Sequence, residues 1–105
     1  MILSTSGSQA FAAALARELD EELGAVGYRR FSDGELLVEG PPDVAGRAVV
    51  VGATLSGDAH VELLQLQDAA REAGADEVVT VLPYMGYARQ DDAFKPGQPV
   101  SARAV

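Results

Sequence analysis

An apolar segment runs directly into a polar loop in the stretch VVTVLPYMGYARQDD, residues 78–92. Its first residues are mostly β-branched, which predicts a buried strand, and Pro83 ends that strand. The loop then carries aromatic, glycine, guanidinium, amide and carboxylate groups in close succession. In an open α/β sheet, ligands bind just beyond the carboxyl ends of the strands. The stretch therefore indicates an α/β fold with a binding site at this loop.

The rest of the chain predicts alternating strands and helices, as such a fold requires. From the N-terminus, the predicted elements are a strand at 1–3, a helix from Ser8 to Leu23, a hairpin of 28–31 and 35–38, a strand at 48–51, a helix at 59–73, a strand at 77–82 and a helix beginning at Ser101. We expect Gly24 to end the first helix and Asp58 to cap the second. The β-branched run at 48–51 predicts a strand that is covered on both faces.

Each of three features in the sequence allows two interpretations. The turn Ser6-Gly7-Ser8 either holds an anion at a helix N-terminus or is only a capped turn, with Ser6 and Gln9 as a capping box. The segment Phe31-Ser32-Asp33-Gly34-Glu35 is either a plain turn or an aromatic ring and two carboxylates that hold a flat, amine-bearing base. His60 is either a surface residue or a metal ligand; without cysteine or a second histidine, we assign no metal-binding residues.

Composition restricts the class of protein. At 105 residues, with 48% hydrophobic and 23% charged residues, the chain is expected to form one domain, without a membrane-spanning segment or a secretory signal, so we expect a cytoplasmic protein. The net charge of −8 argues against nucleic-acid and membrane surfaces, which need basic patches. The basic residues are seven arginines and Lys95. Acid-rich, lysine-poor chains occur in salt-loving organisms, which suggests a halophilic origin.

The C-terminal end indicates an incomplete domain. A helix that begins at Ser101 is cut off after one turn at Val105, and one turn is not stable alone. We therefore expect residues 1–105 to be the front part of a longer domain.

Three motifs together resemble the N-terminal domain of ribose-phosphate pyrophosphokinases, also called phosphoribosyl pyrophosphate synthetases. They are the segment 31–35, Asp58 with the following helix at 61–64, and the loop 83–91, and the resemblance covers essentially the whole chain. Residues 94–101 look most like the archaeal-type branch. The resemblance implies a phosphoribosyltransferase-like, three-layer α/β/α domain with a mostly parallel sheet, truncated before its last elements.

The resemblance also implies an activity and a site. In that family, the pyrophosphoryl group of Mg²⁺-ATP is transferred to ribose 5-phosphate, and the ATP site is shared between subunits of a homo-oligomer. Arg89 and Gln90 would hold ATP from one subunit, while Phe31, Asp33 and Glu35 would come from its neighbour. An arginine suits a base or polyphosphate because its guanidinium is planar, charged and able to stack, and carboxylates suit the amino group of a base.

The catalytic residues of that family lie beyond Val105. The resemblance therefore implies that this chain supplies ATP recognition and subunit contacts and is inactive alone. The alternative is a non-catalytic, adenine-nucleotide-binding or regulatory subunit. A further possibility is an α/β domain whose loop at 84–90 is only structural.

Overall fold

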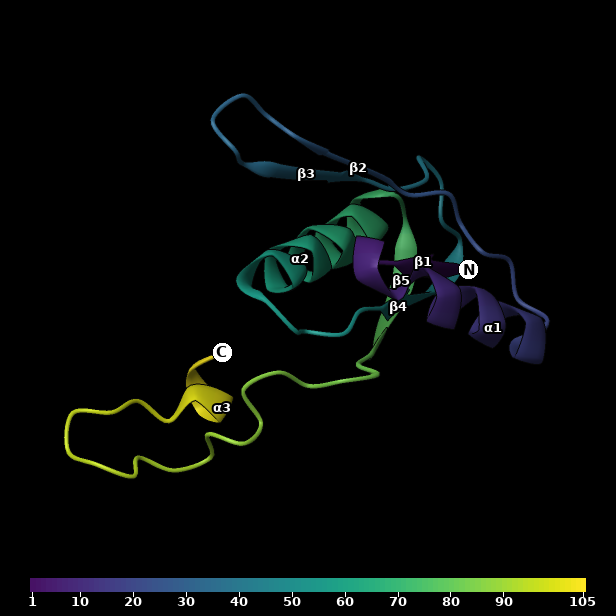
Figure 1. Ribbon diagram of the computed structural model, residues 1–105. Coiled ribbons are helices and arrows are strands. Elements are labelled where there is room, and N and C mark those ends of the chain that lie inside the picture. Colours follow the sequence, from purple (N-terminus) through teal and green to yellow (C-terminus); the bar gives the residue numbers. More distant parts are fainter.

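A parallel three-stranded sheet forms the centre of the computed structural model, which describes residues 1–105 (Figure 1). Its strands are β1 (Ile2–Ser4), β4 (Gly46–Val51) and β5 (Ala75–Val81), in the order β1-β4-β5. Because the strands are parallel, their carboxyl ends meet at one edge of the sheet. The loops that follow β1, β4 and β5 therefore start close together.

Helices cover both faces of this sheet. Helix α1 (Gln9–Leu19) buries Ala12 and Ala16 against Ile2 and Val51, and α2 (Gly57–Glu72) packs on the other face. The larger core cluster lies on the α2 side; its members are Leu3, Val38, Val44, Ala48, Val50, Leu63, Leu66, Ala70 and Ala75. The expected α/β/α layers and the strand covered on both faces are thus confirmed. No helix has the length and apolar character that crossing a membrane would need.

A separate antiparallel hairpin lies on the outer side of α2. It consists of β2 (Gly27–Arg30) and β3 (Leu36–Glu39), and it is not hydrogen-bonded to the central sheet. The Tyr28 hydroxyl donates to the Ser4 carbonyl, and Gln65 of α2 bonds to the backbone of β3 at two points. Side chains therefore attach the hairpin to the body of the domain.

The segment after β5 extends away from the sheet (Figure 1). Residues 82–100 contain turns and bends and lead to the short helix α3 (Ser101–Ala104). A short 3-10 helix, η1 (Ser6–Ser8), follows β1. The strands and the second helix lie within two residues of their predicted bounds.

The prediction for the end of the first helix was wrong. Helix α1 ends at Leu19, and Asp20 adopts the left-handed conformation with φ 51°. Gly24 instead meets a packing requirement, because a Cβ atom there would lie 2.5 Å from Cδ2 of Leu3. In this helix Ala12 and Ala16 are buried, whereas Phe11 and Leu19 are about half exposed.

The cap of the second helix was also predicted wrongly. Ser56, not Asp58, is the N-cap of α2, and its hydroxyl accepts a hydrogen bond from Ala59 N at 3.1 Å. The helix begins earlier than expected, so Asp58 lies in its first turn, where a negative charge is still favourable. This frees the Asp58 carboxylate for a contact described below.

Candidate functional site

The loop after β5 is anchored to the loop after β4 through Thr54. Thr54 is buried; its backbone N–H donates to Tyr84 O at 3.0 Å, and its hydroxyl accepts from Gly86 N at 2.9 Å. Gly86 allows this close approach, because a Cβ atom at that position would lie 1.8 Å from Thr54 O. The first part of the polar loop is thus fixed at the carboxyl edge of the sheet.

A turn at residues 87–90 presents Arg89 to solvent. Tyr87 has φ 66°, its carbonyl accepts from Gln90 N at 3.1 Å, and its ring lies 5.8 Å from that of His60. The Arg89 side chain makes no hydrogen bond or ion pair within the chain. Its guanidinium is therefore free to meet an anion or a flat ring.

Gln90 has a partly structural role. Its side-chain oxygen accepts a hydrogen bond from the Ser101 hydroxyl, and its backbone carbonyl accepts from Ala102 N at 3.0 Å. These bonds hold the start of α3 against the loop. The side-chain amide N–H groups of Gln90 have no partner in the chain and remain available as donors.

The hairpin loop at 31–35 exposes all three of its predicted site residues. Phe31 N donates to Glu35 O at 2.8 Å, Gly34 N to Phe31 O at 2.9 Å, and Glu35 N to the Asp33 carboxylate at 3.0 Å. Phe31 is 49% exposed, and the Arg29 guanidinium lies 5.7 Å from its ring centroid. Phe31, Asp33 and Glu35 therefore lie close together on an ordered turn.

The two predicted halves of the site do not meet within one chain. The hairpin loop lies beyond the N-terminal end of α2, while the loop carrying Arg89 and Gln90 extends from the other side of the molecule (Figure 1). The two groups therefore lie on separate loops that point away from each other within one chain.

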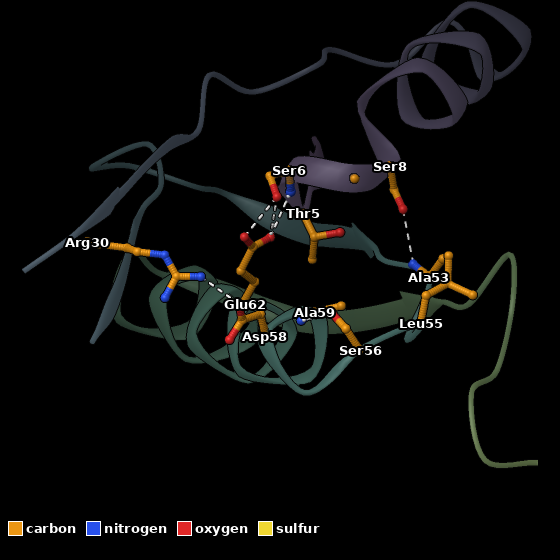
Figure 2. A pocket seen from close by; sticks show the side chains of 11 residues that line it. Thr5, Ser6, Ser8, Arg30, Ala53, Leu55, Ser56, Asp58, Ala59 and Glu62 are labelled. Carbon is orange, nitrogen blue, oxygen red and sulfur yellow. Dashed lines mark hydrogen bonds and ion pairs between the residues drawn. The ribbon is translucent and has the colours of Figure 1, made fainter. Parts of the chain in front are cut away.

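A polar pocket of about 300 Å³ lies at the carboxyl ends of β1 and β4 (Figure 2). Ser6 donates to the Glu62 carboxylate from its backbone N–H at 2.8 Å and from its hydroxyl at 2.8 Å. Glu62 is 7% exposed. This turn is therefore not an open anion site, because the protein's own carboxylate already uses its donors. The capping box is also absent, since Gln9 donates instead to Ser6 O.

No group of three or more His, Cys, Asp or Glu side chains is arranged to hold a metal ion. His60 Nδ1 lies 2.8 Å from Ser56 O in the first turn of α2.

Several residues that shape the site escaped the sequence analysis. Thr54 fixes the loop after β5, Glu62 fills the turn after β1, and Arg30 contacts both the hairpin turn and Asp58. Only Arg30 could have been found from the sequence. Side chains alternate along a strand, so Arg30 must point to the face opposite Arg29 and Phe31. The contacts of Thr54 and Glu62 join residues distant in sequence, so no local pattern reveals them.

Comparison with known proteins agrees with the fold and the motifs. A family model described as the N-terminal domain of ribose phosphate pyrophosphokinase matches residues 1–105. The chain is 68% identical over 106 residues to a ribose-phosphate pyrophosphokinase of Halobacterium salinarum and 46% identical over 107 residues to one of Methanopyrus kandleri. These alignments cover the whole of this chain and 38% and 37% of those proteins.

A solved structure shows the same arrangement. The crystal structure of phosphoribosylpyrophosphate synthetase from Mycobacterium smegmatis matches with a TM-score of 0.83 and 28% sequence identity, over 99% of this chain and 36% of that one. The chain spans little more than a third of the length of these relatives. The family match over residues 1–105 shows that this chain belongs to the family of N-terminal domains of ribose phosphate pyrophosphokinases.

Proposed function

We propose that this chain is the ATP-recognising part of an enzyme that transfers the pyrophosphoryl group of ATP to ribose 5-phosphate, giving phosphoribosyl pyrophosphate and AMP. Family membership and the 68% identity to the Halobacterium salinarum protein support this activity. The proposal includes a homo-oligomer and a cytoplasmic location, where both substrates are available. Because residues 1–105 span only 38% of the Halobacterium salinarum relative, we expect them not to turn over alone.

The proposal depends on one observation: two groups of exposed residues that suit different parts of ATP lie apart in the domain. Arg89 and Gln90 offer a free guanidinium and free amide donors on one side of the domain, and the ring of Phe31 with two carboxylates lies on the other. In this proposal, the site that uses both forms between two copies of the chain. Such an arrangement makes ATP binding depend on assembly.

The chemistry of the groups assigns each to one end of ATP. Phe31 offers one ring face to adenine, since Arg29 lies near the ring. Asp33 and Glu35 accept hydrogen bonds from the exocyclic amine but repel phosphates, so they belong at the base. Arg89 stacks on the base or pairs with the phosphates.

Magnesium is expected to enter with ATP and to neutralise phosphate charge. No group of three or more His, Cys, Asp or Glu side chains is arranged to hold it. The contribution of this chain is therefore the binding and orientation of the nucleotide.

Replacement of Arg89 tests the proposal. We expect Arg89→Ala to weaken ATP binding by about 10- to 100-fold, because a hydrogen bond to a charged group contributes about 1.5–3 kcal/mol. Titration calorimetry measures the affinity, and far-UV circular dichroism checks that the fold is unchanged. Arg17→Ala is the matched control, since it removes the same charge from an exposed position on α1. Equal ATP affinity of the two variants would contradict the assignment of Arg89.

A further inference from the structure

Arg30 connects the hairpin turn to the first turn of α2. Its Nη2 lies 2.5 Å from Oδ2 of Asp58, and its Nη1 donates to Gly34 O at 2.8 Å. Figure 2 shows the Arg30 side chain reaching Asp58 at one end of the polar pocket. A guanidinium can make both contacts at once because its two terminal nitrogens are held in a rigid, planar fork.

The direction of the Arg30 side chain follows from the strand. Successive side chains of a β-strand point to opposite faces, so Arg30 faces α2 while Arg29 and Phe31 share the other face. Asp58 is held independently in the first turn of α2, where its charge also interacts favourably with the helix dipole. The helix therefore provides a fixed anchor for the hairpin turn.

No other side-chain hydrogen bond or ion pair joins the end of the hairpin to the rest of the domain. A two-stranded hairpin is at best marginally stable by itself. Tyr28 attaches its base to Ser4, and Gln65 attaches β3 at Leu36 and Val38. Residues 31–35 are all exposed, so packing does not hold them. Arg30 is the side chain that joins this turn to the rest of the domain.

We propose that the Arg30–Asp58 pair positions the hairpin loop at 31–35 for the nucleotide. This inference rests on the proposed function, which assigns Phe31, Asp33 and Glu35 to ATP. Arg30 and Asp58 are positioning residues, because they set the orientation of the turn. Both side chains are more than half exposed, so the pair adds little to global stability. Its effect is on the geometry of the loop.

A double-mutant cycle of Arg30→Ala and Asp58→Ala tests the pair in two ways. The first readout is amide hydrogen exchange of Phe31, Gly34 and Glu35, whose N–H groups are hydrogen-bonded within the turn. The second is the dissociation constant for ATP. We expect each single variant to raise both the exchange rates and the dissociation constant by about 3- to 10-fold, and the double variant to add little more. The midpoint of thermal unfolding should stay nearly constant.

Two further sets of variants sharpen the result. Arg30→Lys keeps the charge beside Asp58 but cannot bridge to Gly34 O as well, so it should restore only part of the protection. Arg47 and Glu77 form an exposed ion pair of 3.0 Å between β4 and β5 and serve as the matched control. The cycle of Arg47→Ala and Glu77→Ala should leave the hairpin exchange rates and the ATP affinity unchanged.

The two readouts separate this inference from the proposed function. Unchanged exchange at 31–35 in Arg30→Ala and Asp58→Ala would overturn the positioning role, whatever the ATP affinity. Additive effects of the two substitutions would overturn it as well, because the residues would then act independently. A wild-type chain that does not bind ATP would instead overturn the proposed function, and the exchange rates would still decide the role of the pair.

Discussion

Gly86 is the residue at which the loop after β5 depends on the absence of a side chain. A Cβ atom there would lie 1.8 Å from Thr54 O, which no real contact permits. We expect Gly86→Ala to displace the loop, to remove the protection of the Gly86 and Thr54 amides from hydrogen exchange, and to cost about 1–3 kcal/mol of stability. Denaturant unfolding and hydrogen exchange measure the two effects.

A second glycine provides the control for that experiment. A Cβ atom at Gly57, in the first turn of α2, would meet nothing within 4 Å. Gly57→Ala should therefore leave stability unchanged or slightly raised. If the two alanine variants unfold at the same denaturant concentration, the close approach of Gly86 to Thr54 does not exist in solution.

Tyr28 makes the free energy of unfolding of the domain vary with pH in the alkaline range. Burial raises the pKa of the Tyr28 hydroxyl and the negative charge of Glu62 acts in the same direction, whereas an interaction with the Ser4 side chain lowers it. Because the pKa is higher in the folded state, the contribution of the neutral hydroxyl is fully present below the unfolded pKa of about 10 and is lost as pH rises through the folded value.

The variant Tyr28→Phe lacks this titration. At pH 7 we expect it to be less stable than the wild type by about 1 kcal/mol, the usual contribution of one hydrogen bond. Above about pH 10 the difference should shrink, since only the wild type then loses the neutral hydroxyl. Denaturant unfolding of both proteins from pH 7 to 11 measures the difference, and parallel curves would show that Tyr28 titrates equally in both states.

At the scale of elements, the sequence predicted the strands well and the helix ends poorly. The β-branched runs before Gly52 and Pro83 predicted buried strands, and both runs are strands. The end of β4 is largely buried, but Val78 to Val81 of β5 are only half-buried, because β5 lies at the edge of the sheet. Gly24 has the residue type that often ends a helix, but the packing of Leu3 is what requires a glycine there. The N-cap of the second helix is Ser56 rather than Asp58. Such outcomes depend on contacts between distant segments, which local patterns do not contain.

The candidate site was predictable only as two separate groups of residues. Their types and local turns were visible in the sequence, and the exposure of Arg89 and Phe31 agrees with a role in binding. The resemblance implied that the two groups belong to different subunits, but the attachment of the hairpin to α2 through Arg30 and Gln65 was not predictable, because it joins residues distant in sequence. ATP binding by these residues stays a prediction.

Gln65 tests that attachment. Its side-chain oxygen accepts from Val38 N at 2.9 Å and its amide donates to Leu36 O at 2.8 Å, so it takes the place of a neighbouring strand. We expect Gln65→Leu to leave both backbone groups without partners, to cost about 1–3 kcal/mol and to speed amide exchange across β2 and β3. Denaturant unfolding and hydrogen exchange report these changes.

A glutamate at the same position separates the two bonds. Gln65→Glu can still accept from Val38 N, but a carboxylate has no N–H for Leu36 O. It should therefore lie between the wild type and Gln65→Leu in stability at neutral pH. Equal hairpin exchange in all three proteins would show that packing alone attaches the hairpin to α2.

At the scale of the whole molecule, the negative charge is largely uncompensated. The chain carries a net charge of −8, and the structure contains three ion pairs, which involve Glu21, Asp58 and Glu77. Most of its sixteen acidic residues therefore repel one another without a paired cation. Repulsion between exposed charges opposes compaction at low salt and is screened at high salt, where the Debye length falls to about 3 Å at 1 M. We infer that the domain is adapted to high salt concentrations.

This inference predicts that stability rises with salt. Between 0.1 M and 2 M NaCl we expect a gain of at least about 1 kcal/mol, which corresponds to about 4–8 °C in the melting temperature of a domain of this size. Salt also strengthens apolar burial, so a charge variant must separate the two effects. Replacing Glu18, Asp43, Glu72 and Asp76, four exposed residues outside the ion pairs, by their amides changes the net charge from −8 to −4. That variant should melt higher than the wild type in 0.1 M NaCl and gain less on going to 2 M, whereas equal gains would assign the salt effect to the core rather than to the acidic surface.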